Sequence, residues 1–317
     1  MSDGRLAECK GRNLARFFEL RGWSVAAVGG TCWVSSGTRA RWLMNIPDHV
    51  FPEAQPEALA ALLRAENMFA LRYPSREEPG LPAGLYMCRD RNYSIKNVAR
   101  GFRSAVKGGL ARCEVRRVSP DEMLSQGLEC NRETMQRQGR YNPEFGDAKR
   151  WAVFVEAASQ VPAIQVTGAF VDGQLAAYQL GCLDDGCWNI AYAFSRSRLL
   201  EHHPNHALMY STLEKSLRRP EVEAVCAGPK TVLVQDGLHD FKTRMGFEVE
   251  PHQVVVRFHP LLEGLLVSSL VRKPIEMLRK ARPETLLLKR VQAFLGAARS
   301  ARNGAASPEL AMAGRNG

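Results

Sequence analysis

Alternating and helical hydrophobic patterns divide the chain into many short strands and helices. Leu14, Phe17 and Phe18 recur at helical spacing, which predicts a helix over 14–21. The Gly29-Gly30 pair separates two apolar runs, 23–28 and 32–35, and so predicts two strands joined by a turn. The same patterns predict strands over 42–46, 69–73 and 84–88, a helix over 56–67, and a basic helix over 94–107 closed by Gly108-Gly109.

A second series of elements begins near Cys113. The run Ser119-Pro120-Asp121-Glu122 is a typical helix start, with a capping serine, a proline in the first turn and acids near the positive end of the helix dipole. The pair Asp172-Gly173 between two apolar runs predicts a β-hairpin. The predicted order is β-α-α-β-β-β-α-β-α-β, with strands 113–118, 163–171, 174–183, 187–195 and 223–227, and helices 121–138, 148–159 and 205–218.

The segment HDFKTRMGFEVEPHQVVVRF, residues 239–258, predicts a short helix followed at once by a strand. Phe241 and Met245 lie four residues apart, on one helix face. Lys242 and Arg244 stand in the last turn, where the helix dipole favours cations. Gly246 suits the left-handed conformation that ends a helix.

These elements predict two α/β units with helices flanking mixed sheets, residues 1–112 and 113–260. Beyond Pro260 the pattern changes to basic amphipathic helical segments, 261–296. Residues 297–317, rich in Ala, Gly, Asn and Ser, are predicted to be disordered.

The net charge of +10 is concentrated in two blocks. Residues 86–117 contain nine Lys or Arg against Asp90 and Glu114, and residues 257–303 contain ten against three Glu. Two basic blocks suit a polyanionic ligand, an anionic membrane surface or nucleic acid. Each block alone is equally consistent with a solvated face.

Several function classes are disfavoured by missing motifs. The eight cysteines form no CxxC pair, so neither a zinc ribbon nor a thioredoxin-like site is indicated, and we interpret them as reduced thiols of a cytoplasmic protein. His202, His203 and His206 have partial metal-ligand spacing, but Pro204 interrupts their helix, and no metal is expected. GxSxG, P-loop and GxGxxG patterns do not occur, nor does an apolar run of membrane-spanning length.

The order of elements resembles the GNAT acyltransferase fold, and two such units resemble the bacterial FemAB-like branch with its tandem GNAT domains. The resemblance is carried by FVDGQLAAYQLGCLDDGCWNIAYAFS at 170–195, NHALMYSTLEKSL at 205–217, HDFKTRMGF at 239–247 and the basic stretch YSIKNVARGFRSAVKGGL at 93–110. It covers roughly 90–258, and more faintly 1–90. It implies transfer of an acyl or aminoacyl group to an amine, with acyl-CoA or an aminoacyl-tRNA as donor.

One departure from the GNAT pattern concerns the donor. The glycine-rich loop that holds the acyl-CoA pyrophosphate is absent from RSRLLEHHPNHALMY, 196–210. Arg196, Arg198 and Asn205 are the candidates for binding a phosphate at the following helix start. The usual tyrosine before the last Gly-Phe is also replaced, so the resemblance implies that Lys242 or Asp240 is aimed at the acyl group.

Further candidates lie on the predicted helices and strands. His206, near a helix start, is a candidate for phosphate contact or general base. Tyr192, Tyr178 and Asn189 sit on the central strands, and we expect Asn189 and Tyr192, three residues apart, to face opposite sides. A second group forms one helical stripe that suits substrate phosphates: Arg100, Arg103 and Lys107.

The sequence therefore predicts an N-acyltransferase acting on a cell-envelope or polysaccharide precursor or a small metabolite. The basic segments past residue 260 would permit peripheral contact with the anionic inner face of a membrane. Nucleic acid is not expected except tRNA as donor, and the oligomeric state stays open. The alternative is a non-catalytic GNAT-fold protein that binds a polyanion such as nucleic acid.

Overall fold

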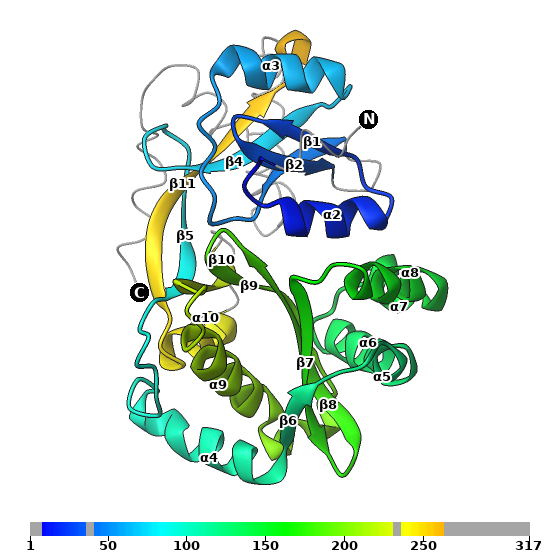
Figure 1. The fold of residues 1–317 in the computed structure, drawn as a ribbon, viewed down its shortest axis with the longest axis vertical. Coiled ribbons are helices and arrows are strands. Elements are labelled where there is room, and N and C mark those ends of the chain that lie inside the picture. The colour runs from blue at the N-terminus through cyan, green and yellow to red at the C-terminus, as the bar shows by residue number, and fades with distance from the viewer. Residues whose placement is uncertain (1–7, 36–40, 231–235, 263–317) are drawn as a thin grey trace, which may run out of the picture. The chain divides into compact units, whose positions relative to one another are not determined.

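The computed structural model describes residues 8–35, 41–230 and 236–262, drawn in Figure 1. The chain divides into two compact units, one of residues 1–15, 22–84 and 251–317 and one of residues 16–21 and 85–250. This division differs from the predicted boundary after residue 112. Except for Leu261 and Leu262, the predicted segments 261–296 and 297–317 lie outside the described residues.

The first unit contains a mixed sheet in the order β1-β2-β3-β4-β11. β3 and β4 are parallel, and the other described pairs are antiparallel. Trp33, Leu59 and Leu71 lie in its core. The elements are α2 (Arg12–Leu20), β1 (Val25–Val28), β2 (Thr31–Ser35), β3 (Trp42–Ile46), α3 (Pro56–Ala65), β4 (Ala70–Ser75), β5 (Leu81–Cys88) and β11 (Glu248–Phe258), of which α2, β5 and β11 contribute residues to both units.

The second unit follows the predicted order of elements. The predicted helix 148–159 and strand 187–195 are confirmed at both ends. The sequence did not predict α7 or the 3₁₀ turns η1 and η3. The elements are η1 (Arg100–Phe102), α4 (Arg103–Arg112), β6 (Glu114–Arg117), α5 (Pro120–Glu122), η2 (Met123–Gly127), α6 (Leu128–Arg137), α7 (Pro143–Gly146), α8 (Ala148–Ser159), β7 (Ile164–Val171), β8 (Gln174–Asp184), β9 (Cys187–Ser195), η3 (Ser197–His202), α9 (Pro204–Leu217), β10 (Ala224–Lys230) and α10 (Asp236–Arg244).

The sheet of the second unit has helices on both faces. Its strand order is β5-β10-β9-β8-β7-β6, in which β9 and β10 are parallel and the pairs from β6 to β9 are antiparallel. Figure 1 shows α5 to α8 on one side of β7–β9, and α4, α9 and α10 on the other. Trp188, Leu213 and Val225 are in the core beneath α9, whereas Trp151 and Phe154 of α8 are buried on the opposite face.

The helix from Pro120 to Arg137 contains a π-turn, η2. The indole nitrogen of Trp151 donates a hydrogen bond of 2.9 Å to the carbonyl of Met123, within this turn. A Cβ on Gly127 would lie 2.8 Å from the Trp151 ring, so only glycine fits beside the indole. The widened turn is therefore fixed by one tryptophan of α8.

The basic helix lies further along the chain than predicted. The glycines expected to close it, Gly108 and Gly109, lie inside α4, which begins at Arg103 and ends at Arg112. A Cβ on Gly109 would lie 2.6 Å from the carbonyl oxygen of His203 and 3.1 Å from Cβ of Ala207. The glycine is kept because α4 packs closely on the start of α9, and this contact outweighs its low helix propensity.

The two neighbouring glycines allow a matched test. We predict that Gly109→Ala destabilises the protein by about 1–3 kcal/mol, because its methyl group would force α4 away from α9. The control, Gly108→Ala, meets only the His203 ring at 3.7 Å. It should stabilise the protein by up to about 1 kcal/mol through helix propensity. Urea unfolding of both variants measures this, and equal effects of the same sign would contradict the packing argument.

Candidate functional site

The candidate site lies in the second unit, where β10 separates from β9. The two strands pair in parallel at Ala224, Val225 and Cys226. β9 then continues to Ser195 and β10 to Lys230. Gly228, with φ of +81°, gives the backbone of β10 a conformation outside the β region just after the paired stretch. The edge of β9 that follows Asn189 is thus available to an extended ligand.

Lys242 of α10 is held at this point of separation. Its side chain is buried, with 9% of the residue exposed. Nζ donates a hydrogen bond of 2.6 Å to the carbonyl of Ala227, the first residue after the paired stretch. Nζ also lies 4.4 Å from the ring centroid of Tyr86. A carbonyl and an aromatic face are partners that stabilise an ammonium group.

The Tyr86 ring is itself fixed by α10. Its hydroxyl and Nδ1 of His239 are 2.9 Å apart, and burial raises the pKa of the phenol. Tyr86 and His239 therefore position the face on which the Lys242 ammonium rests. The sequence reasoning missed both residues. The available signal was the pairing of an aromatic strand, 81–88, with a helix whose positions 239 and 242 lie one turn apart.

His206 lies in an aromatic cluster at the start of α9. The centroid of its ring is 5.0 Å from that of Phe102 and 5.2 Å from that of Phe241. Burial, with a smaller contribution from His203, lowers the pKa of His206 to about 4. A base with that pKa takes up a proton poorly near neutral pH. The cluster therefore favours a neutral, packing His206 over a general base.

The start of α9 offers few backbone donors to a phosphate. Pro204 at the first helical position has no N–H, and the N–H of His206 donates to the carbonyl of His203 at 3.1 Å. Asn205 is turned toward Ser195, with Nδ2 3.3 Å from Oγ. The pyrophosphate-binding arrangement considered from the sequence therefore has little backbone support here.

The two arginines before α9 face a carboxylate. Arg196 is buried, and its guanidinium lies 2.9 Å from Oε2 of Glu129 on α6. Arg198 is more exposed and lies 3.9 Å from Oε1 of the same glutamate. Their charge is thus shared with Glu129 on the α6 side of the sheet.

Asp240 and the basic stripe are only partly placed as predicted. Asp240 forms an exposed ion pair of 2.7 Å with Arg244, one turn along α10, whereas Lys242 is buried. Arg103 donates to the carbonyls of Val98 and Lys96, each at 2.9 Å, and so anchors the chain before α4. Arg100 lies in η1 and Lys107 in α4, and both are exposed.

The expectation that Asn189 and Tyr192 face opposite sides is wrong. A β-bulge pairs Ile190 with Gly181 and Tyr192 with Leu180, which leaves Ala191 as an extra residue. The bulge shifts the alternation by one, so both side chains lie on the face covered by α6 to α8. Lys242 packs instead with the cluster beneath α9.

Each of these strand residues has polar partners in that layer. The Asn189 amide donates to the carbonyls of Cys182 and Cys187. Tyr192 accepts a hydrogen bond of 3.2 Å from Arg21, which is paired with Glu144. Tyr178, on the same face, is fully buried and donates to Oδ1 of Asn131.

Two classes of site have no support in the described part of the chain. No group of three or more His, Cys, Asp or Glu side chains there is placed to hold a metal ion. None of the described helices combines the length and apolar character needed to cross a bilayer.

No protein-family model matches the chain, and no curated relative matches its sequence. Two solved structures share its fold. FemX aligns with a TM-score of 0.56 at 13% identity, over 80% of this chain and 92% of FemX. The C-terminal domain of a lysylphosphatidylglycerol synthetase candidate from Agrobacterium fabrum aligns with a TM-score of 0.51 at 11% identity, over 80% of this chain and 89% of that one. The predicted FemAB-like, tandem GNAT-type fold is thus confirmed.

The His206 environment predicts a pH-dependent stability. Because its pKa is about 4 in the folded protein and near 6.5 in the unfolded chain, the unfolded state binds the proton more readily. The stability contributed by the neutral imidazole is complete above pH 6.5 and falls as the pH drops toward 4. We predict that His206→Gln loses less stability than the wild type between pH 7.5 and 4.5. Urea midpoints at both pH values test this, and parallel losses would contradict it.

Proposed function

We propose that this chain, which has the fold of FemX, is an acyl or aminoacyl transferase whose reacting carbonyl meets the Lys242 ammonium where β9 and β10 separate. The observation that carries the proposal is the position of Nζ, 2.6 Å from the Ala227 carbonyl and over the Tyr86 ring. A buried cation held at a strand split is placed to meet charge that develops on a bound acyl group. Its own contacts keep it oriented before substrate arrives.

The reaction that suits this geometry is direct transfer to an amine. The amine nitrogen forms a bond to the acyl carbon, and negative charge develops on the carbonyl oxygen. The Lys242 ammonium donates a hydrogen bond to that oxygen. The ester or thioester bond then breaks, and the leaving group takes up the proton that the amine releases. Alignment of the two substrates supplies much of the remaining acceleration.

The donor is held in part by backbone contacts. The edge of β9 beyond Asn189 offers N–H and C=O groups to an extended donor arm, as an edge strand does to a peptide. The start of α9 gives a pyrophosphate few N–H groups, and Arg196 is paired with Glu129. These contacts favour an aminoacyl ester, such as aminoacyl-tRNA, over acyl-CoA. We propose an amine of an envelope or polysaccharide precursor, or of a small metabolite, as acceptor.

The test combines a donor panel with a matched pair of lysine variants. Acetyl-CoA, dodecanoyl-CoA and bulk aminoacyl-tRNA are each incubated with lysine and glucosamine, and N-acylated products are quantified by mass spectrometry. We predict that Lys242→Met lowers the turnover about 10²–10³-fold. The donor Kd should change little, because the lost contact acts on the transition state.

The control is Lys215→Met, which removes an exposed lysine from α9 and should leave turnover unchanged. Lys242→Met turning over within threefold of the wild type, with an unaltered melting temperature, would refute the role of Lys242. If tRNA binds in a salt-sensitive manner and no donor yields product, the enzyme proposal fails in favour of the non-catalytic polyanion-binding alternative.

A further inference from the structure

A cavity of about 460 Å³ lies in the second unit, on the sheet face covered by α8. Its inner wall is apolar and tightly packed: Met123, Phe154, Val155 and Ile164 are each at most 4% exposed. Val118, Ala158 and Val166 extend this wall toward the edge strand β6. The volume lies in the range of small-molecule sites, roughly 300–1,000 Å³.

One wall of the mouth carries a charge-neutral pair. The guanidinium of Arg116 binds both carboxylate oxygens of Glu122, at 3.0 and 2.7 Å, and lies 3.6 Å from the Phe170 ring centroid. Glu122 also accepts from the N–H of Ser119, which closes the capping box of α5. The hydrogen bond from Arg116 is the main cause that lowers the pKa of Glu122 to about 2. This pair is therefore committed to itself at neutral pH.

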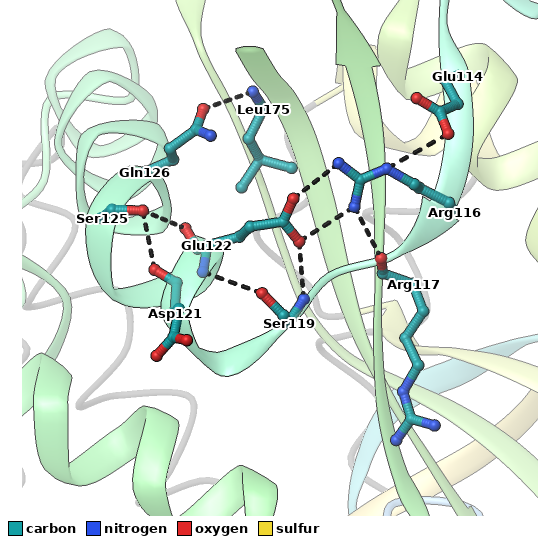
Figure 2. A network of polar contacts seen from close by, with 9 residues as sticks. All are labelled: Glu114, Arg116, Arg117, Ser119, Asp121, Glu122, Ser125, Gln126 and Leu175. Atoms are coloured by element: carbon teal, nitrogen blue, oxygen red, sulfur yellow. Dashed lines mark hydrogen bonds and ion pairs between the residues drawn. The ribbon is translucent and has the colours of Figure 1, made fainter. Parts of the chain in front are cut away.

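Arg117 at the same mouth is not committed. Figure 2 shows its side chain pointing away from the Arg116–Glu122 pair. Its carbonyl accepts from Arg116 at 3.1 Å, but its guanidinium makes no ion pair or hydrogen bond with any residue that the structure describes. Because Glu122 neutralises Arg116, the lining residues retain the positive charge of Arg117.

We propose that this cavity binds an amphiphile with one alkyl chain and an anionic headgroup, the chain against Met123 and Phe154 and the headgroup on Arg117. An apolar body with one cation at its mouth matches that chemistry and disfavours cationic or purely polar ligands. The headgroup is a carboxylate or a phosphate, both of which a guanidinium can bind with two parallel hydrogen bonds.

This site is separate from that of Lys242. The cavity is lined by β6, β7, α8 and the turn after β6, whereas Lys242 packs with Tyr86 in the cluster beneath α9 on the opposite face. The proposal therefore goes beyond the transferase function and does not depend on it.

Isothermal titration of the full chain tests the proposal with laurate and dodecyl phosphate as the two anionic probes, below their micelle concentrations. Hexanoate measures the dependence on chain length, and monolaurin and dodecyltrimethylammonium measure the dependence on charge. We expect saturable binding of one molecule per chain. Affinity should rise roughly threefold to fourfold per added methylene until the cavity is filled. The stronger anionic probe identifies the headgroup.

Three variants separate charge from cavity. Arg117→Gln should weaken laurate binding about tenfold, because a charge-assisted contact is lost. The control, Arg150→Gln, removes an exposed arginine of α8 that does not line the cavity and should leave binding unchanged. Ala158→Leu adds bulk to the inner wall and should weaken laurate more than hexanoate. Melting curves confirm that each variant is folded.

The outcomes decide the proposal. Loss of affinity in Arg117→Gln and Ala158→Leu, but not in Arg150→Gln, supports it. Equal binding of laurate and dodecyltrimethylammonium would show partition without an anion site and would overturn it. Unsaturable binding, or the same affinity in all three variants, would also overturn it.

Discussion

A parallel strand pair that ends after three residues leaves buried backbone groups in need of other partners. β9 and β10 form such a pair, and the first carbonyl beyond it, that of Ala227, receives its hydrogen bond from the Lys242 side chain. The separation of the strands and the burial of the lysine are thus two sides of one constraint. The end of α10, the face of Tyr86 and the position of His239 all follow from the need to bring one ammonium group to that carbonyl.

The two faces of the second sheet divide the chemistry between them. Beneath α9 the aromatic cluster of Phe102, His206 and Phe241 adjoins the helix that carries Lys242. Beneath α6 to α8 the polar groups of the strands are joined to helix side chains. Thr134 is an example, since its hydroxyl donates to the carbonyl and accepts from the N–H of Ser195. The second face is therefore a fixed support, and the strand split belongs to the first.

The sequence predicted the fold well because strand and helix patterns depend on neighbours only a few residues apart. The hairpin at Asp172-Gly173 and the capping box at Ser119 are both present, as local rules require. It failed where distant packing decides. Gly108 and Gly109 are typical helix ends, yet the approach of α4 to α9 places them inside a helix.

The candidate residues were harder to predict for the same reason. The bulge at Ala191 moves Tyr192 to the face of Asn189, and nothing in the strand pattern signals it. Lys242 stands in a last helical turn, where a cation is ordinary on dipole grounds alone. Only the structure shows that this lysine is buried against a carbonyl and a ring. Tyr86, its aromatic partner, lies more than 150 residues earlier in the chain.

The π-turn at Met123–Gly127 has a consequence for how this chain can change length. A π-turn holds one residue more than the α-helix around it needs, and each residue of an α-helix advances by about 100°. Deletion of one residue here would regularise the helix and swing Asn131 away from Tyr178 and Thr134 away from Ser195. The segment therefore tolerates exchange of exposed side chains, such as that of Leu124, far better than the gain or loss of a single codon.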